Sequence, residues 1–202
     1  MRMEPGYLLG MALQTVPQPR KIARDLFDLG LSRQTLWTAL LLVVVLNASL
    51  GVIAGMLMPL DAKQVGSILA NPVMLGMVEA VFMFGLSWGI YLIGRMFGGQ
   101  GGLSDAILTV VWMEFIFLII QAVTLVLTLF APGLAAIAMV TSVFLFFWIL
   151  SHFTTESHGF NSVGLVFTAI VGFLILTIFA MSFILVLLGV EPVTIPVTPP
   201  AN

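Results

Sequence analysis

Residues 103–130 read LSDAILTVVWMEFIFLIIQAVTLVLTLF, and a second apolar run over 133–153 follows almost at once. The first run exceeds the roughly 20 residues that cross a bilayer as an α-helix. Because only Ala131 and Pro132 separate the two runs, the helices that they form must be antiparallel neighbours. The stretch therefore predicts a membrane-spanning helical hairpin.

The composition of the whole chain indicates the same environment. Of its 202 residues, 60% are hydrophobic and 8% are charged, whereas soluble domains carry about 25% charged residues. The net charge of −2 provides no basic field, so no nucleic-acid partner is expected. The chain has no cysteine, which excludes disulfides, thiolate metal sites and cysteine nucleophiles.

Five apolar segments are each near or above the length of a membrane span. They cover 35–58, 72–97, 103–130, 133–153 and 162–190. The connections between them are short, and the first contains Pro and Asn, residues at which helices commonly end. With no room for a soluble domain between the spans, the fold class is all-α: a polytopic bundle of five transmembrane helices over 35–190.

Two amphipathic pieces, 8–16 and 20–29, precede the first span and are separated by two prolines. Gly30 is expected to end the second piece, and Ser32 is expected to cap the first span. Such helices lie in the headgroup region with their apolar face toward the lipid. The other interpretation, packing on the loops of the bundle itself, remains equally open.

The distribution of basic residues predicts the orientation of the bundle. Five Lys or Arg residues precede the first span and Arg95 lies at the second–third turn, whereas Lys63 alone falls on the opposite side. The positive-inside rule therefore makes the segment 1–34 cytoplasmic. With five spans, the Pro-rich tail 191–202 is expected on the other side of the membrane.

The loop between the second and third spans is rich in glycine: residues 93–106 read IGRMFGGQGGLSDA. A P-loop requires a lysine and a dinucleotide fingerprint requires a βαβ unit, and neither pattern is met. The glycines instead allow a tight reversal between two spans. Ser104 is expected to cap the third helix, with Asp105 at its positive end. The predicted residues of this cytoplasmic loop are Arg95, Gly98, Gly99, Gln100, Gly101, Gly102 and Asp105.

Two acids within the spans are the best local indication of a functional site. Glu79 in the second span and Glu114 in the third are predicted to lie at similar depths, and Gln121 follows two turns after Glu114 on the same face. No Lys or Arg in the spans can pair with them, and two carboxylates in a dry site do not both ionise readily. The predicted cluster either carries protons or binds a cation, or it simply holds helices together by hydrogen bonds.

Small residues spaced four apart recur in three of the spans. This small-xxx-small pattern lets helix backbones approach closely and can provide a face for self-association. The predicted helix-packing residues are Gly51, Gly55, Gly85, Gly89, Gly164 and Gly172.

The turn between the fourth and fifth spans contains three side chains of metal-ligating type. His152 and Glu156 are four residues apart and His158 follows, but the spacing is not that of H-E-x-x-H. A solvated interfacial turn is the favoured interpretation, and a metal site is the alternative. The predicted turn residues are His152, Glu156, His158, Gly159 and Phe160. No serine elbow is found, and no base is placed to activate a serine within the membrane, so no catalytic residue is predicted. No metal and no cofactor are predicted either.

The order of several motifs resembles the Yip-domain family, and in particular its short bacterial members. The motifs are Pro19 and Leu36-Trp37 ahead of the first span, Gly98-Gly-Gln-Gly101 after the second, Trp112 early in the third, and FTTESHGF at 153–160 before the fifth. The resemblance covers about 13–188. It implies a five-helix, multi-pass protein of the bacterial inner membrane with a cytoplasmic N-terminus and a periplasmic C-terminus.

The resemblance also brings in a class of binding partner, Rab-type GTPases, that this chain is not well suited to bind. Eukaryotic members of the family bind Rab-type GTPases and act in vesicle traffic and membrane shaping. This chain has no long acidic N-terminal region and no counterpart of their Asp-Leu-Tyr-Gly-Pro stretch before Thr35, which makes GTPase binding doubtful.

The leading hypothesis is a non-enzymatic membrane protein that acts by helix–helix association or as an accessory subunit of a larger assembly. Its partners would be the lipid bilayer and either itself or another membrane protein. The alternative is a small proton- or cation-linked transporter built around Glu79, Glu114 and Gln121. An intramembrane hydrolase has the weakest support and would require zinc bound by the three turn residues.

Overall fold

The computed structural model describes residues 5–57 and 71–187, which form seven helices and no strand. The helices are α1 (Pro5–Thr15), α2 (Pro19–Phe27), α3 (Arg33–Leu57), α5 (Pro72–Met96), α6 (Leu103–Phe130), α7 (Pro132–His158) and α8 (Val163–Leu187). Five of them, α3 and α5 to α8, are long and apolar enough to cross a membrane. The predicted all-α, multi-pass architecture is confirmed. Lys63 and the predicted tail 191–202 lie outside the described residues.

The ends of the spans follow local capping chemistry. Asn71 accepts hydrogen bonds from the backbone N–H groups of Val73 and Met74 at 2.9 and 3.4 Å, and Pro72 begins α5. Ser32 accepts from the Thr35 N–H at 3.1 Å, as expected for the cap of α3.

Two predicted helix ends were wrong. The cap of α6 is Gly102, whose N–H donates to Asp105 Oδ2 at 2.9 Å, so Ser104 lies inside the first turn and not at the cap. α7 continues past 153 to His158 and ends at Gly159, which has φ 70°. The polar residues after 153 continue the helix because they pack against other parts of the protein, not because they favour a membrane interior.

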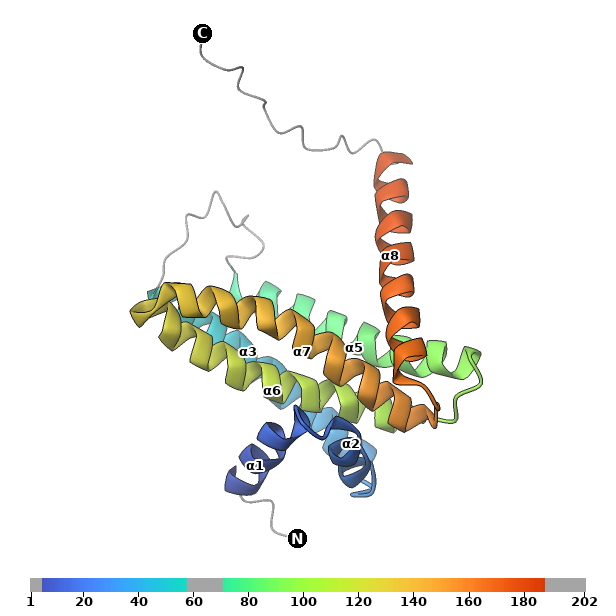
Figure 1. The fold of residues 1–202 in the computed structure, drawn as a ribbon. Helices are drawn as coiled ribbons and strands as arrows, with labels where there is room; N and C mark the ends of the chain where they lie inside the picture. The colour runs from blue at the N-terminus through green and yellow to red at the C-terminus, as the bar shows by residue number, and fades with distance from the viewer. Residues whose placement is uncertain (1–4, 58–70, 188–202) are drawn as a thin grey trace.

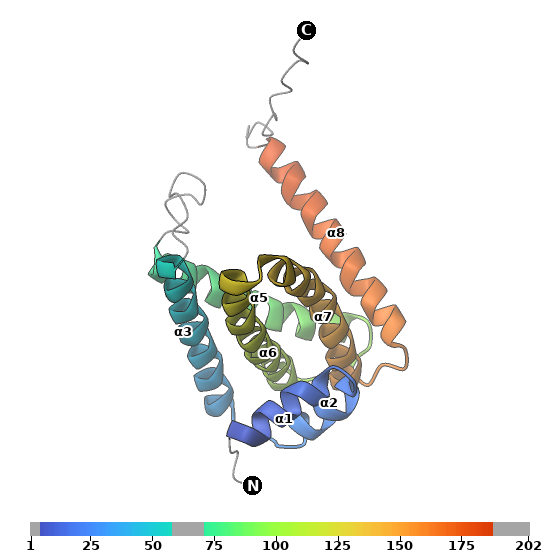
Figure 2. The same cartoon turned by 60° about the vertical axis from the view of Figure 1, so that its left-hand side comes forward.

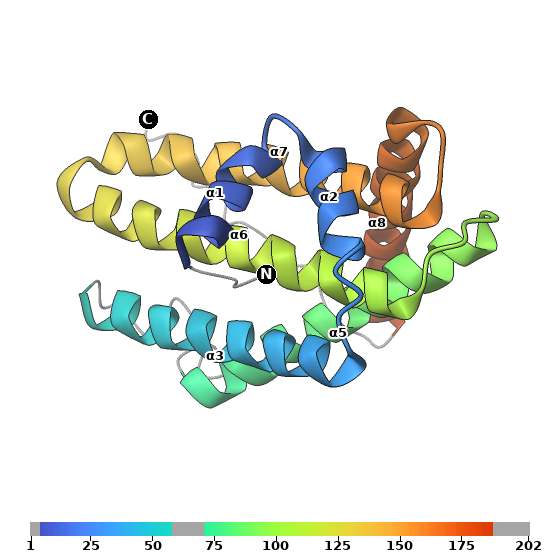
Figure 3. The same ribbon diagram turned by 90° about the horizontal axis from the view of Figure 1, so that it is seen from below.

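Four of the spans, α3, α5, α6 and α7, lie side by side, and α6 and α7 form the expected hairpin (Figures 1 and 3). One end of this bundle carries the 97–102 loop and the 159–162 turn and is termed the loop end. α8 leaves the bundle there and runs steeply away from it (Figure 2). It packs against α7, and most of its side chains remain exposed.

α2 packs against the bundle and forms part of its core. Ile22, Ala23 and Leu26 are buried against α7 and α6, and Phe27 meets Phe153 edge to face with ring centres 6.2 Å apart. Of the two interpretations that the sequence left open, the structure therefore favours packing on the bundle. The contact is with the helices themselves and not with their loops.

Candidate functional site

The two acids within the spans are joined by an asparagine from a third helix. Asn47 of α3 donates through Nδ2 to Glu79 Oε1 of α5 at 2.6 Å and to Glu114 Oε2 of α6 at 3.3 Å. Its Oδ1 atom is buried and accepts no hydrogen bond from the described residues. The cluster thus ties three helices together through one amide group.

A cavity of about 730 Å³ surrounds this cluster and extends between α3, α5, α6 and α7. Gln121 lines the same cavity, but its side chain makes no hydrogen bond to the described residues. The other polar side chains that line it are Thr124, Thr128 and Ser142. The structure therefore places Glu79, Glu114 and Gln121 around one space, with Asn47 linking the two acids. Carboxylate, amide and hydroxyl oxygens are suited to hold a proton or a hard cation.

Sequence reasoning missed Asn47, although a signal was present. It is a strongly polar amide in the middle of an apolar span, where polar side chains usually find a partner on another helix. The acids attracted attention because of their charge. Only the packing of α3 against both α5 and α6 shows that the amide reaches both acids.

At the loop end, His158 is buried against the glycine loop. The His158 residue is only 2% exposed. Its Nδ1 accepts a hydrogen bond from the Gly101 N–H at 3.1 Å, and its Nε2 lies 3.1 Å from the Ile90 carbonyl oxygen. The His158 carbonyl accepts from the Gln100 N–H at 3.1 Å. The end of α7 is therefore joined to both the end of α5 and the following loop.

Three glycines form the space that this ring occupies. A Cβ atom at Gly99 would lie 2.6 Å from the His158 Cβ, and one at Gly101 would lie 2.8 Å from the ring. A Cβ at Gly94 would also collide with the ring. Gly98, with φ 83°, provides the reversal of the chain that was predicted for this loop. The remaining loop residues, Arg95 and Gln100, have exposed side chains.

The other two residues of the proposed metal set have different neighbours. Glu156 accepts from Arg20 Nε at 2.8 Å and pairs with Arg24 Nη2 at 2.7 Å, which ties α2 to α7. The hydrogen bond from Arg24 to Glu156 raises the pKa of that guanidinium above its ordinary value. His152 instead packs against Trp148, with ring centres 4.2 Å apart and the ring planes tilted by 48°. Within the described ranges, no three His, Asp or Glu side chains gather to hold a metal.

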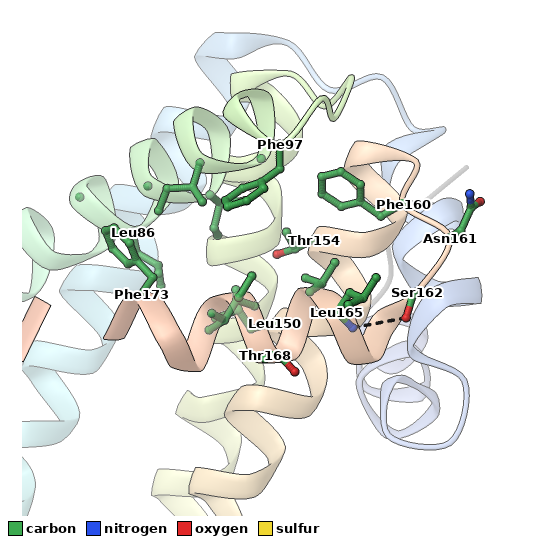
Figure 4. A pocket seen from close by; sticks show the side chains of 18 residues that line it. Leu86, Phe97, Leu150, Thr154, Phe160, Asn161, Ser162, Leu165, Thr168 and Phe173 are labelled. Carbon is green, nitrogen blue, oxygen red and sulfur yellow. Dashed lines mark hydrogen bonds between the residues drawn. The ribbon is translucent and has the colours of Figure 1, made fainter. Parts of the chain in front are cut away.

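A second space, of about 770 Å³, opens between α5 and the diverging α8 (Figure 4). This groove is almost wholly apolar, with Phe97 and Phe160 at the loop end and Leu86 and Phe173 farther along. Gly85 and Gly89 lie in its wall, and a Cβ at either would meet nothing within 4 Å. It is termed the α5–α8 groove.

The remaining small residues are also unequally packed. A Cβ atom at Gly51 would lie 3.5 Å from the Leu75 side chain of α5, so α3 and α5 approach closely there. A Cβ at Gly55 or Gly172 would meet nothing within 4 Å, and one at Gly164 would meet only the nearby Ser162. None of these three positions makes a close helix–helix contact among the described residues.

The Yip1 domain profile matches residues 13–184, most of the chain. The chain belongs to the Yip1-domain family. No curated protein matches it, and no solved structure does. The matched region of this Yip1-domain protein begins near the end of α1 and includes the polar cluster, the His158 contact and the α5–α8 groove.

Proposed function

We propose that this protein is a non-enzymatic component of the bacterial inner membrane that associates with other membrane helices as an accessory or scaffolding subunit. The observation that carries this proposal is the α5–α8 groove. A helix surface with exposed backbone at Gly85 and Gly89 allows another helix to approach closely. In a bilayer, close contacts between helix backbones at small residues stabilise association through van der Waals packing.

The occupant proposed for the groove is a helix from a second copy or from another membrane protein. α8 itself contacts α7 and leaves α5 uncovered at these glycines. The diverging α8 also presents its own exposed side chains on the other wall. Both walls are therefore available to one inserted helix.

The test is to fill the groove from its α5 wall. Gly89→Leu should convert an oligomer or complex, extracted in mild detergent and sized by light scattering, to the bare monomer. Gly55→Leu is the matched control, because Gly55 is also an uncovered small-residue position but lies on α3 outside the groove. A wild-type protein that is already monomeric and partner-free, or a Gly89→Leu complex of unchanged mass, would contradict the proposal.

A second function, proton- or cation-linked transport, is supported by the Asn47–Glu79–Glu114 cluster and its cavity. The cavity lies between four spans, and two carboxyl groups there share one amide donor. Addition of a proton or a cation would relieve the repulsion between the two carboxylates. That property is what a coupled transport site needs.

This second function predicts a pH-dependent flux in reconstituted vesicles, followed with an entrapped pH-sensitive dye. Glu79→Gln and Glu114→Gln should each abolish it while the melting temperature stays close to that of the wild type. Asp25→Asn, which changes an exposed acid on α2, should have no effect. Flux that survives both glutamate substitutions would end this idea.

The orientation proposed for the molecule is N-terminus cytoplasmic and C-terminus periplasmic. It is supported by the gathering of Arg20, Arg24, Arg33 and Arg95 near the loop end of the described bundle. The same reasoning makes 1–34 a cytoplasmic segment, 35–190 the membrane domain and 191–202 an extracytoplasmic tail.

A further inference from the structure

The N-terminal helix α1 has an unusual surface for a segment outside the predicted spans. None of its 11 residues, PGYLLGMALQT, is charged. One side, which includes Met11, Ala12 and Thr15, packs on the protein. The opposite side remains apolar and exposed: Tyr7 is 54%, Leu9 48% and Leu13 78% exposed. Gln14 is the one polar side chain on that exposed side, and it is uncharged.

Two tryptophans fix the position of the turn that follows α1. Trp112 of α6 donates through Nε1 to Thr15 Oγ1 at 3.0 Å, and Trp148 of α7 donates through Nε1 to the Val16 carbonyl oxygen at 3.1 Å. Figure 3 shows α1 crossing the α6–α7 hairpin away from both of its ends. α1 therefore lies beside the middle part of two membrane spans.

The lengths of these spans give the depth of the turn. α6 has 28 residues and is about 42 Å long, whereas the hydrocarbon core is about 30 Å thick. Trp112 is nine residues from the loop end of α6, a distance of about 14 Å. Even if the whole excess of about 12 Å extended from the membrane at the loop end, Trp112 would lie at the hydrocarbon boundary or deeper.

The backbone of the turn is suited to this depth. Irregular backbone within a bilayer must have its polar groups satisfied by protein. Pro17 and Pro19 have no N–H group, the Gln18 N–H donates to the Gln14 carbonyl oxygen at 3.0 Å, and the Val16 carbonyl has its indole donor. The two prolines that separate α1 from α2 thus reduce the number of donors that water would otherwise have to satisfy.

We propose that the exposed side of α1, formed by Tyr7, Leu9 and Leu13, is embedded among the acyl chains of the leaflet at the loop end. This surface is continuous with the lipid-facing side of α7, where Phe144 and Trp148 are exposed one turn apart and Trp148 holds the turn. α1 is then a membrane-embedded element that occupies one leaflet only, in addition to the five spans. The Yip1 domain match begins only at residue 13, so most of α1 lies outside it.

The absence of cysteine from the chain makes this proposal directly testable. A spin label at Leu13→Cys, in the full-length protein in vesicles of phosphatidylethanolamine and phosphatidylglycerol, reports its surroundings through collisions with oxygen, which concentrates in lipid, and with a water-soluble nickel chelate. Val143→Cys on the exposed side of α7 is the lipid reference, and Lys21→Cys on the exposed side of α2 is the water reference. Because Leu13 is exposed, its substitution should not disturb folding.

The expected result is that the Leu13 label collides with oxygen more than with the nickel chelate, as the Val143 label does, while the Lys21 label shows the reverse. A Leu13 label as accessible to nickel as the Lys21 label would overturn the proposal in favour of an aqueous position. A label shielded from both reagents would overturn it in favour of a covering protein partner. The same labelling at Leu9→Cys must agree.

Discussion

At the scale of single residues, His158 at the end of α7 links α7 to the end of α5 and to the 97–102 loop. Because Nδ1 accepts from the Gly101 N–H, the proton of the neutral ring lies on Nε2, which donates to the Ile90 carbonyl oxygen. A proton added to Nδ1 would point at the Gly101 N–H, so the hydrogen bond between Gly101 and His158 would be lost. Phe160 stacks on the ring at 5.6 Å, so the turn that leads into α8 rests on it.

This arrangement predicts a strong coupling between Gly94 and His158. Gly94→Ala should destabilise the protein by about 1–3 kcal/mol, since the new methyl group would overlap the imidazole. In a His158→Ala background the same substitution should cost much less, because the three nearest atoms to that methyl group all belong to the imidazole. The measurement is a double-mutant cycle of unfolding free energies in detergent.

Gly89→Ala serves as the control, because it lies on the same helix and its Cβ would meet nothing within 4 Å. Its effect should be the same in both backgrounds: a stabilisation of at most about 1 kcal/mol from the better helix propensity of alanine. Equal costs for Gly94→Ala with and without the histidine would show that the ring does not occupy the space between the glycines.

Sequence alone predicted that glycines of this loop allow a tight reversal, but not that the reversal lies at Gly98 or why its neighbours are also glycine. Flexibility of a turn can be inferred from nearby residues, whereas the steric limit at Gly94, Gly99 and Gly101 comes from a ring more than fifty positions away. Asn47 was missed for a related reason: its partners lie on two other helices. Contacts between distant segments leave no spacing pattern in a single sequence.

At the scale of elements, α2 is held to α7 by a buried apolar stripe and by the two arginine pairs to Glu156. Glu156→Gln should lower the melting temperature by roughly 2–4 °C, the shift that about 1 kcal/mol produces in a chain of this size. Added salt should lower the melting temperature of the wild type toward that of the variant, because salt screens ion pairs near a surface.

The matched control is Lys21→Gln on the exposed side of α2, which makes no ion pair within the described ranges. Thermal unfolding of the wild type and both variants at low and high salt checks the prediction. A Glu156→Gln protein that melts with the wild type and keeps the same salt response would show that the apolar stripe alone positions α2.

The helices were predictable because each span is a long apolar run closed by local signals. Asn71, Pro72 and Ser32 mark their helix starts through their own side chains. The end of α7 was placed too early because TTESH at 154–158 looks like a turn until α2 and the glycine loop are packed against it. The steep departure of α8 also has no local signal, since an apolar helix of this length satisfies its own backbone in any direction.

At the scale of the whole molecule, the arrangement of the other parts depends on the α6–α7 hairpin crossing the membrane. The crossing follows from two helices of 28 and 27 residues with one residue between them, and from side chains that stay apolar and exposed over the half nearer the turn. The loop end then lies in one compartment and the 131–133 turn in the other. The positions of the polar cluster, of α1 and of the α5–α8 groove all depend on this arrangement.

The most direct measurement is the labelling of two single-cysteine variants in spheroplasts with a membrane-impermeant maleimide. Gly133→Cys lies at the exposed α6–α7 turn and Gln100→Cys at the exposed loop end. If the hairpin crosses the membrane, the Gly133→Cys variant should be labelled in intact spheroplasts, whereas the Gln100→Cys variant should be labelled only after the membrane is permeabilised. Labelling of both variants from the same side would contradict a hairpin that crosses the membrane.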